Sequence, residues 1–333
     1  MQSQTPKRTL FTRRHFLATT LATVASATGA VAYGANPRGK PVRVVVPFPP
    51  GGPTDMIARI VSLAMGEQVG SAYVIDNKSG ASGMIGANAV AKAQADGSTL
   101  LMNVSAHVIN PLIYKEVLDD PLKDFTPITK LASTPIQLVV SADSPFKTFE
   151  DLVTAVKANP EKYTFASSSI GAPGHLTGEL FKQAIKRNIT HVPYKGSAPA
   201  LTDVIGGQVS YMFDSMPSSI NFVRSGRLRA LGVTAHERVP SLPDVPTFAE
   251  LGYPTLNLST WYGLWAPANT PEAIVQAVYA NAKKALTAAA VIKQLEQIQA
   301  YPGGEDPQAF SNFCREETTR YASIIQAAGI KPV

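Results

Sequence analysis

The stretch "VVVPFPPGGPTD", residues 44–55, decides how the rest of the chain is interpreted. Three β-branched valines, which favour a strand, run directly into a turn rich in proline and glycine. The prolines stiffen this turn because they fix φ, while Gly51 and Gly52 allow a tight backbone and the close approach of a ligand. Thr54 can cap the helix that follows, and Asp55 lies in its first turn. Exposed N–H groups at the positive end of a helix predict a binding site for a carboxylate or a phosphate.

Strands and helices alternate along the rest of the chain. The pattern predicts strands at residues 42–46, 73–76, 99–104 and 136–141, and helices at residues 54–69 and 84–95. A second βα series covers residues 149–234, followed by a strand at residues 256–266 and helices at residues 271–288, 291–299 and 307–328. Short apolar strands separated by helices indicate an α/β protein with mostly parallel pairing.

The two series predict two lobes, and the chain crosses between them twice. Lobe 1 is expected to comprise residues 41–141 and 257–333, and lobe 2 residues 142–256. Ligands of open α/β sheets bind beyond the carboxyl ends of the strands, so we expect a cleft between the lobes.

The first 32 residues have the composition of an export signal. Four basic residues precede an uncharged, apolar run at residues 17–32, and Ala30-Val31-Ala32 suits a signal peptidase. Arg13-Arg14 fits a twin-arginine signal, and an ordinary secretory signal is the alternative. Either signal is cleaved and places the protein in the periplasm.

The charge of the chain comes largely from this segment. The chain has 30 Lys and Arg against 24 Asp and Glu, a net charge of +6. Four of the basic residues and no acid precede Asn36, which leaves 26 against 24, or +2. Without a dense basic patch, nucleic acid is excluded as an expected partner. The single cysteine, Cys314, lies in an amphipathic pattern and is expected to pack as a small hydrophobe.

Further turns follow other predicted strands. Residues 77–83, "NKSGASG", again leave the backbone open before a helix, but Met84 stands where a nucleophile elbow would need its second glycine. In the turn at residues 166–171, serine hydroxyls can donate to an anion. His175 and Glu179 share one helix face, which admits a metal or acid–base role, although a structural or cleft-lining histidine is expected.

Two strand ends of the second lobe carry Tyr194 and Asp214, which are expected to reach the cleft from the side opposite the glycine turn. Ser167, His175 and Asp214 supply the residue types of a hydrolytic triad, but the sequence does not show that they meet, and such sets occur by chance in any long chain.

These turns together resemble the periplasmic substrate-binding proteins of tripartite tricarboxylate transporters, the Bug family. The resemblance covers essentially the whole chain after the signal and rests on three runs in order: "VRVVVPFPPGGPTD" at residues 42–55, "HVPYKGSAPALTDVIGG" at 191–207 and "FDS" at 213–215. Members usually carry an Asn-Arg-Pro-Gly-Ala-Gly-Gly-Asn-like second turn. This chain departs from it at Lys78, Ser79, Ser82 and Met84, so the ligand contacts of this loop do not follow from the family pattern.

The resemblance implies a two-lobed periplasmic-binding-protein (Venus flytrap) fold, with two mixed or mostly parallel sheets, flanking helices and an interlobe cleft. Such a protein closes on a small organic carboxylate and delivers it to membrane permease subunits. It is not an enzyme, and we expect a monomer without cofactor or metal.

The resemblance also assigns residues to the cleft. One ligand carboxylate would face the two turns of lobe 1, at Phe48, Pro50, Gly51, Gly52, Thr54, Asp55, Ala81, Ser82 and Gly83. The rest of the cleft would be lined by Ser105, Ser168, Ser169, His175, Tyr194 and Asp214. Asp214 would either meet an ammonium or hydroxyl group of the ligand or only brace its loop.

Two rival interpretations remain at this stage. One is an exported α/β hydrolase or transferase that uses Ser and His in the same cleft. The other is a sensor that presents its closed form to a signalling partner. The sequence alone separates neither the sensor from the transport receptor nor one carboxylate from another.

Overall fold

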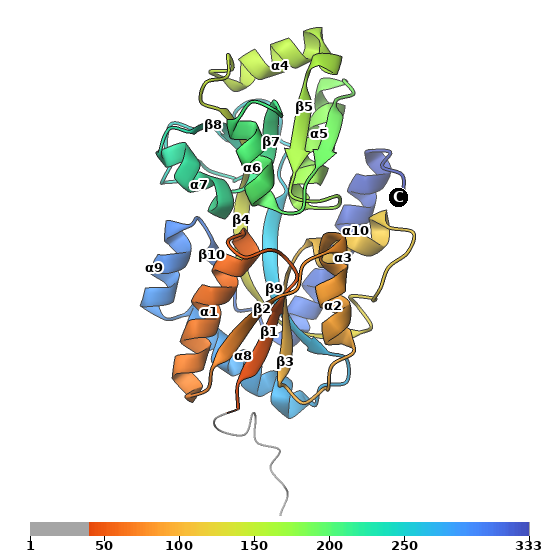
Figure 1. The fold of residues 1–333 in the computed structure, drawn as a ribbon, viewed down its shortest axis with the longest axis vertical. Coiled ribbons are helices and arrows are strands. Elements are labelled where there is room, and N and C mark those ends of the chain that lie inside the picture. The colour runs from red at the N-terminus through yellow and green to blue at the C-terminus, as the bar shows by residue number, and fades with distance from the viewer. Residues whose placement is uncertain (1–39, 333) are drawn as a thin grey trace, which may run out of the picture. The chain divides into compact units, whose positions relative to one another are not determined.

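A computed structural model describes residues 40–332, so the predicted export signal lies outside the described residues (Figure 1). In the first half of the sheet, β1 (Val42–Val46) lies between β2 (Tyr73–Asn77) and β3 (Thr99–Val104), and both pairs are parallel. The valines of β1 are buried on both faces: Val45 belongs to one apolar cluster, Val44 and Val46 to another. This explains why the strand reads as a continuous apolar run.

Two long strands extend the sheet. β9 (Ser259–Pro267) pairs antiparallel with β3 and with β4 (Phe125–Ser141), and β10 (Tyr301–Pro302) adds a short antiparallel pair to β4. β4 pairs with β9 up to residue 135 and with strands of the second half from residue 136. The two halves of the sheet are therefore continuous through β4, as Figure 1 shows.

The second half of the sheet combines both orientations. β5 (Thr164–Ser167) runs parallel to β6 (Thr190–Pro193) and to β7 (Tyr211–Ser215). β7 and β8 (Leu228–Val233) pair antiparallel with β4. The sheet is mixed, with its parallel pairs at the two ends of the strand order.

Helices cover the sheet. Those of the first half are α1 (Pro53–Val69), α2 (Met84–Ala91), α3 (Ala106–Ile113), α8 (Glu272–Leu286), α9 (Ala289–Gln297) and α10 (Pro307–Ala327), with the 3-10 turn η1 (Ala81–Gly83). Those of the second half are α4 (Phe149–Ala158), α5 (Pro173–Ile185), α6 (Ser197–Ile205) and α7 (Met216–Arg224), with the 3-10 turn η2 (Pro160–Lys162). In the first half, α1, α8 and α9 share one apolar cluster, and α2, α3 and α10 share the other. The sheet is thus covered on both faces, as parallel strands require.

The βα alternation predicted from the sequence is confirmed, and the differences have identifiable causes. Helix α3 was not predicted, because Pro111 inside it breaks the pattern. Only the end of β4 was predicted, because Pro127 and Pro135 occur in its first part. The pairing of β4 with β9 shifts register just after Pro127, which accommodates a residue without an N–H.

Two further features bear on the class of protein. Cys314 is 1% exposed in the apolar cluster of α10, and burial raises the pKa of its thiol to about 12, so it packs as the predicted small hydrophobe. In the part of the chain that the structure describes, every helix is too short or too polar to cross a membrane. The lobe boundaries at residues 141 and 256 stay a prediction.

Candidate ligand-binding cleft

The turn between β1 and α1 is held from within by a buried carboxylate. Asp55 Oδ2 accepts the N–H of Gly51 at 2.9 Å and Arg59 Nε at 2.8 Å, and Asp55 Oδ1 accepts Arg59 Nη2 at 2.9 Å and Asn77 Nδ2 at 3.0 Å. Asn77 Nδ2 also donates to the Phe48 carbonyl at 3.1 Å, which ties β2 to the turn. Burial alone would raise the pKa of Asp55, but these donors outweigh it and lower the pKa.

This arrangement leaves few N–H groups for a ligand. Gly51 has φ +79°, which favours glycine, and its N–H is already bonded to Asp55. Pro53 is the first helical residue and has no N–H, so the N–H groups of Thr54 and Asp55 head the helix without intrahelical partners. Gly52, just before the helix, has an ordinary φ of −79°.

The turn before α2 has a different backbone. Gly80, Ala81, Ser82 and Gly83 all have positive φ, at 133°, 46°, 52° and 91°. Two of these residues carry a Cβ, and a left-handed backbone is strained for them. Contacts from outside support the turn: the Ser82 hydroxyl lies 2.6 Å from the Tyr114 hydroxyl, and Asn110 Nδ2 donates to the Ser82 carbonyl at 3.1 Å.

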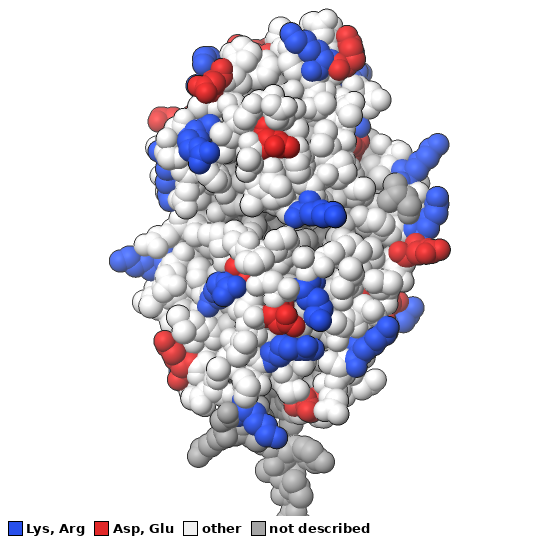
Figure 2. Space-filling model, viewed as in Figure 1, with Lys and Arg blue, Asp and Glu red and all other residues white. Residues whose placement is uncertain are grey.

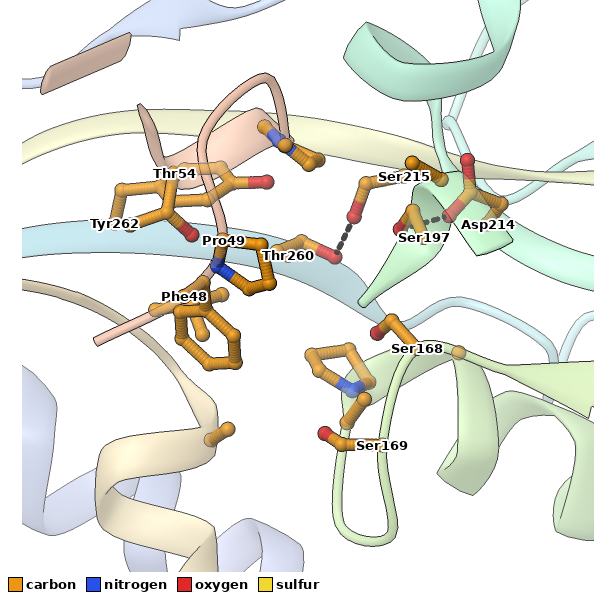
Figure 3. Close-up of a pocket in the computed structure, with 18 of the residues that line it drawn as sticks. Phe48, Pro49, Thr54, Ser168, Ser169, Ser197, Asp214, Ser215, Thr260 and Tyr262 are labelled. Atoms are coloured by element: carbon orange, nitrogen blue, oxygen red, sulfur yellow. Dashed lines mark hydrogen bonds between the residues drawn. The ribbon is translucent and has the colours of Figure 1, made fainter. Parts of the chain in front are cut away.

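One bond from this turn reaches the second half of the molecule. The Ser82 hydroxyl also lies 3.3 Å from the Ile170 carbonyl, in the loop between β5 and α5. A second bridge joins the strands of the two halves, where the Ser215 hydroxyl donates to Thr260 Oγ1 at 2.6 Å (Figure 3).

A stacked pair of histidines lies behind the β5–α5 loop. The rings of His175 and His191 are 4.1 Å apart. His175 Nδ1 accepts the Gly171 N–H at 3.2 Å, and the Ser167 hydroxyl, which donates to the Ser169 carbonyl, lies 2.7 Å from His191 Nε2. The hydroxyl has one proton, so His191 Nε2 must be the donor of its bond. The pair therefore positions the loop.

Both histidines are neutral near pH 7. Burial, with a contribution from Lys182, lowers the pKa of His175 to about 4. Burial lowers the pKa of His191 to about 3, with contributions from His175 and Lys182. His175 Nε2 is 3.7 Å from Glu179 Oε1, and no group of three possible metal ligands occurs among residues 40–332.

Asp214 is a buried brace at the end of β7. The Ser197 hydroxyl donates to its Oδ1 at 2.7 Å, and the Ser218 hydroxyl donates to its Oδ2. These serines lie in the first turns of α6 and α7, so the carboxylate joins two helix N-termini. Burial raises the pKa of Asp214, although the serine donors oppose this.

These geometries rule out the triad. Ser167 bonds to His191 rather than to His175, and His175 faces Gly171 and Glu179. The Asp214 oxygens are taken by serines, so Ser167, His175 and Asp214 are not aligned as nucleophile, base and orienting acid.

Two adjoining cavities lie between the halves. The inner chamber has a volume of about 60 Å³ and is lined by the α1 turn, the β5–α5 loop, the ends of β7 and β9, and the start of α6 (Figure 3). The outer chamber has a volume of about 590 Å³ and lies between the η1 turn, the β5–α5 loop and residues 193–196. Both are bordered by Phe48, Pro49, Ser168 and Ser169.

Most of the residues assigned from the sequence line one of these chambers. The inner chamber is lined by Phe48, Pro50, Gly52, Thr54, Ser168, Ser169 and Asp214. The outer chamber is lined by Phe48, Ala81, Ser82, Gly83, Ser168, Ser169 and Tyr194. Tyr194 donates its hydroxyl to Asp203 Oδ2 at 2.6 Å, and burial, with Asp203, raises its pKa to about 12.

Four assigned residues line neither chamber. The N–H of Gly51 and the carboxylate of Asp55 bond to each other, as described above. Ser105 is fully buried at the start of α3, and its N–H donates to the Trp261 carbonyl at 2.9 Å. His175 lies behind the β5–α5 loop rather than in the cleft. These residues support the site from behind.

The structure adds residues that the sequence did not single out. Ser197, Ser215, Thr260 and Tyr262 line the inner chamber, and Tyr114 and Lys195 line the outer one. Lys195 and Ser197 fall inside the run at residues 191–207, which is one of the three runs on which the family resemblance rests. Nothing in the sequence pointed to Tyr114, which lies just after the unpredicted helix α3.

The cleft has little charge. Among the described residues, Asp214 is the charged side chain that lines the inner chamber and Lys195 the one that lines the outer chamber. Figure 2 shows a hollow across this face that is bordered mainly by uncharged atoms, with basic atoms at its rim. Such a site can bind an anion through neutral dipoles.

Comparisons with known proteins agree with this geometry. The sequence profile of the tripartite tricarboxylate transporter family receptors matches residues 57–330. Protein BugT of Bordetella pertussis is 34% identical over 294 residues, which cover 88% of this chain and 90% of BugT.

Two solved structures are similar over nearly their whole length. The R. palustris protein Rpa4515, solved with adipate, is 38% identical with a TM-score of 0.86, covering 88% of this chain and 99% of that one. MatC from Rhodopseudomonas palustris, with bound malate, is 32% identical with a TM-score of 0.81, covering 86% and 99%. The chain therefore belongs to the tripartite tricarboxylate transporter receptor family, the periplasmic solute-binding proteins of the Bug type.

Proposed function

We propose that this protein captures a small organic carboxylate in the inner chamber and delivers it to the permease of a tripartite tricarboxylate-type transporter. One observation carries the proposal: the start of a helix and a buried, unpartnered hydroxyl line the same small chamber. Gly52 and Thr54 bring the start of α1 to it, and the Ser169 hydroxyl, on a residue that is 7% exposed, has no hydrogen-bond partner among the described residues. In Figure 3 the Ser168 and Ser169 oxygens lie on the cavity side of their loop.

An anion is the ligand that such a site can satisfy. The first N–H groups of a helix have partial positive charge and need acceptors, and serine hydroxyls can donate as well. A carboxylate would therefore lie near the start of α1. It would lie away from Asp214, whose own oxygens are occupied and whose charge would repel it.

Relatives support this ligand class. The adipate in Rpa4515 and the malate in MatC are both small carboxylates, and both proteins share the fold of this chain. The assignment of individual contacts remains our proposal.

Binding is coupled to closure of the two halves. A ligand in the chambers would touch residues of both halves, so it stabilises the closed form by the contacts that only this form provides. The bonds from Ser82 to Ile170 and from Ser215 to Thr260 join the two halves in this structure. We propose no chemical step. Export to the periplasm and cleavage of the signal belong to the same proposal.

A thermal-shift screen of the mature protein tests the ligand class. At a concentration of about 100 times Kd, a ligand adds about 2.7 kcal/mol to the free energy of unfolding. We expect at least one carboxylic acid to raise Tm by about 5 °C, and its primary amide to have no effect. If no acid among dicarboxylates, tricarboxylates, amino acids and aromatic carboxylates changes Tm, the proposal fails. Turnover of a model ester would instead favour a hydrolase.

Delivery is tested separately in cells. Loss of this receptor should abolish uptake of the bound acid, as should loss of the permease. Uptake that persists without the receptor would contradict the delivery role while leaving the binding role intact.

A further inference from the structure

The proposed carboxylate site in the inner chamber leaves the outer chamber without an assigned role. The inner chamber, at about 60 Å³, has room for a few waters or for one carboxylate group. The outer chamber is about 590 Å³ and adjoins it across Phe48, Pro49, Ser168 and Ser169. A ligand whose carboxylate lies in the inner chamber must therefore extend its remaining atoms into the outer one.

The walls of the outer chamber are largely apolar. Phe48, Tyr114 and Tyr194 contribute rings, and Ile85 and Ile170 contribute aliphatic surface. The Tyr114 hydroxyl bonds to Ser82 and the Tyr194 hydroxyl bonds to Asp203. Since both phenol oxygens already have partners, these tyrosines offer a ligand mainly ring surface.

Lys195 is the exception. It is exposed and lines the outer chamber, where no other described residue carries a charge. No hydrogen bond or ion pair among residues 40–332 involves its side chain. Its backbone position is nevertheless fixed, because the N–H of Tyr194 donates to the Ser167 carbonyl at 3.0 Å and that of Gly196 to the Ser168 carbonyl at 2.8 Å. An unpaired cation is thus held on the same loop pair that borders both chambers.

We propose that Lys195 is a specificity-determining residue that recognises a second anionic group at the far end of the ligand. The ligand would place one carboxylate in the inner chamber, an apolar body between the rings, and its second anion at Lys195. This inference rests on the proposed function and extends it. The receptor would select its ligand by the distance between two anionic groups as well as by the first carboxylate. It favours acids with anionic ends separated by an apolar spacer over acids of equal length with one neutral end.

Matched ligands and a charge-removing variant test the proposal. The probes are the straight-chain α,ω-dicarboxylates from succinate to suberate, each paired with its monomethyl ester, measured by calorimetry at low salt. We expect the native protein to bind its preferred diacid about 2- to 5-fold more tightly than the ester, a range suited to a partly exposed ion pair. Lys195→Met should remove this preference, and Lys195→Arg should restore it.

Control measurements distinguish failure of the Lys195 inference from failure of the proposed function. Lys157 is an exposed lysine on α4 that lines neither chamber, so Lys157→Met should keep the native preference. Salt near 1 M, where the screening length is about 3 Å, should weaken the diacid preference in the native protein. Equal binding of diacid and ester by the native protein, or an unchanged preference in Lys195→Met, overturns the inference and leaves the proposed function intact. Failure of every diacid and ester to bind also overturns the inference, whereas the proposed function fails only if the wider set of acids in the thermal-shift screen has no effect either.

Discussion

The two glycine-containing turns of the first half follow parallel strands and precede helices, but they are stabilised differently. The β1–α1 turn is held mainly by its own Asp55, which bonds to Gly51 within the turn and to Arg59 one helical turn later, with a further bond from Asn77 of β2. The η1 turn has four consecutive residues with positive φ and is held by side chains from elsewhere, including a bond to the second half.

The difference indicates that the two turns have separate roles in ligand binding and in closure. We expect a turn braced mainly by its own residues to keep its shape in the open and the closed protein, which would make the start of α1 a preformed ligand site. A strained turn with a contact across the cleft depends on closure, so the η1 turn is expected to change when the halves separate. The following variants test whether the two turns differ in this way.

The largest effect is expected when the internal brace is removed. Asp55→Ala leaves the Gly51 N–H and Asn77 without their acceptor and should lower the free energy of unfolding by about 3 kcal/mol. Urea unfolding measures this. Asp76→Ala is the control, because its surface pair with Arg43, at 3.7 Å, should contribute less than about 1 kcal/mol. Equal losses in both variants would mean that the turn does not depend on Asp55.

The second-largest effect is expected when a larger side chain is placed at the start of α1. Gly52 has an ordinary φ, and a Cβ there would meet only the Pro49 carbonyl at 3.6 Å, so Gly52→Val should fold normally. Its methyl groups would occupy the small inner chamber, and we expect carboxylate affinity to fall about 100-fold, or about 2.7 kcal/mol. Calorimetry measures the loss, with Gly206→Ala, away from both chambers, as the control. Native affinity in Gly52→Val would place the carboxylate elsewhere.

A smaller effect should come from strain in the η1 turn. Ser82→Ala and Ser82→Gly lose the same hydroxyl, but only alanine keeps a Cβ at φ 52°. We expect the glycine variant to be more stable than the alanine variant by about 1 kcal/mol. Both variants lose the bond to Ile170 and should bind the ligand a few-fold more weakly. Equal stability of the two variants would show that the turn stores no strain.

The smallest effect at neutral pH, where His191 is uncharged, concerns the loop shared by both chambers, and it grows as the pH is lowered. The pKa of His191 is lowered to about 3 in the folded protein, against 6.5 as its ordinary value. Between these values the unfolded chain binds more protons, so the histidine lowers stability as pH falls below about 6.5. His191→Gln keeps a donor for Ser167 but does not titrate, so its stability should fall less steeply between pH 6.5 and 4.

Comparing the native protein with His191→Gln cancels a second contribution to the pH dependence of stability, that of Asp119. Burial, with Asp124 and Asp120, raises the pKa of Asp119 to about 6, which stabilises the fold as pH falls through that range. This contribution is the same in both proteins and cancels in the difference. Parallel pH profiles would mean that His191 does not resist protonation.

The sequence predicted the fold well because its signals are local. The valine run of β1, the proline and glycine turn and the alternating helices each depend on neighbouring residues. Sequence missed α3 and most of β4, where Pro111, Pro127 and Pro135 occur inside regular elements. Pairing with β9 overrides the local preference at Pro127 and Pro135, and burial of α3 in the same apolar cluster as α10 does so at Pro111.

The site was predicted in outline but not in its details. Turn chemistry identified the segments that line the cleft, because glycine, proline and serine in such turns limit the possible backbone. It did not indicate which groups were already used: Asp55 and Gly51 satisfy each other, and His175 holds a loop from behind. Such pairings depend on side-chain geometry that no spacing rule contains. Lys195 was visible in its motif, but its lack of a partner was not.

The most direct test of the central claim is a crystal structure of the mature protein with its tightest-binding carboxylic acid. The account predicts one carboxylate in the inner chamber, within hydrogen-bond distance of the Thr54 N–H and the Ser169 hydroxyl, with the two halves closed around it. An acid bound outside both chambers, or a carboxylate held without any contact to the start of α1, would contradict it.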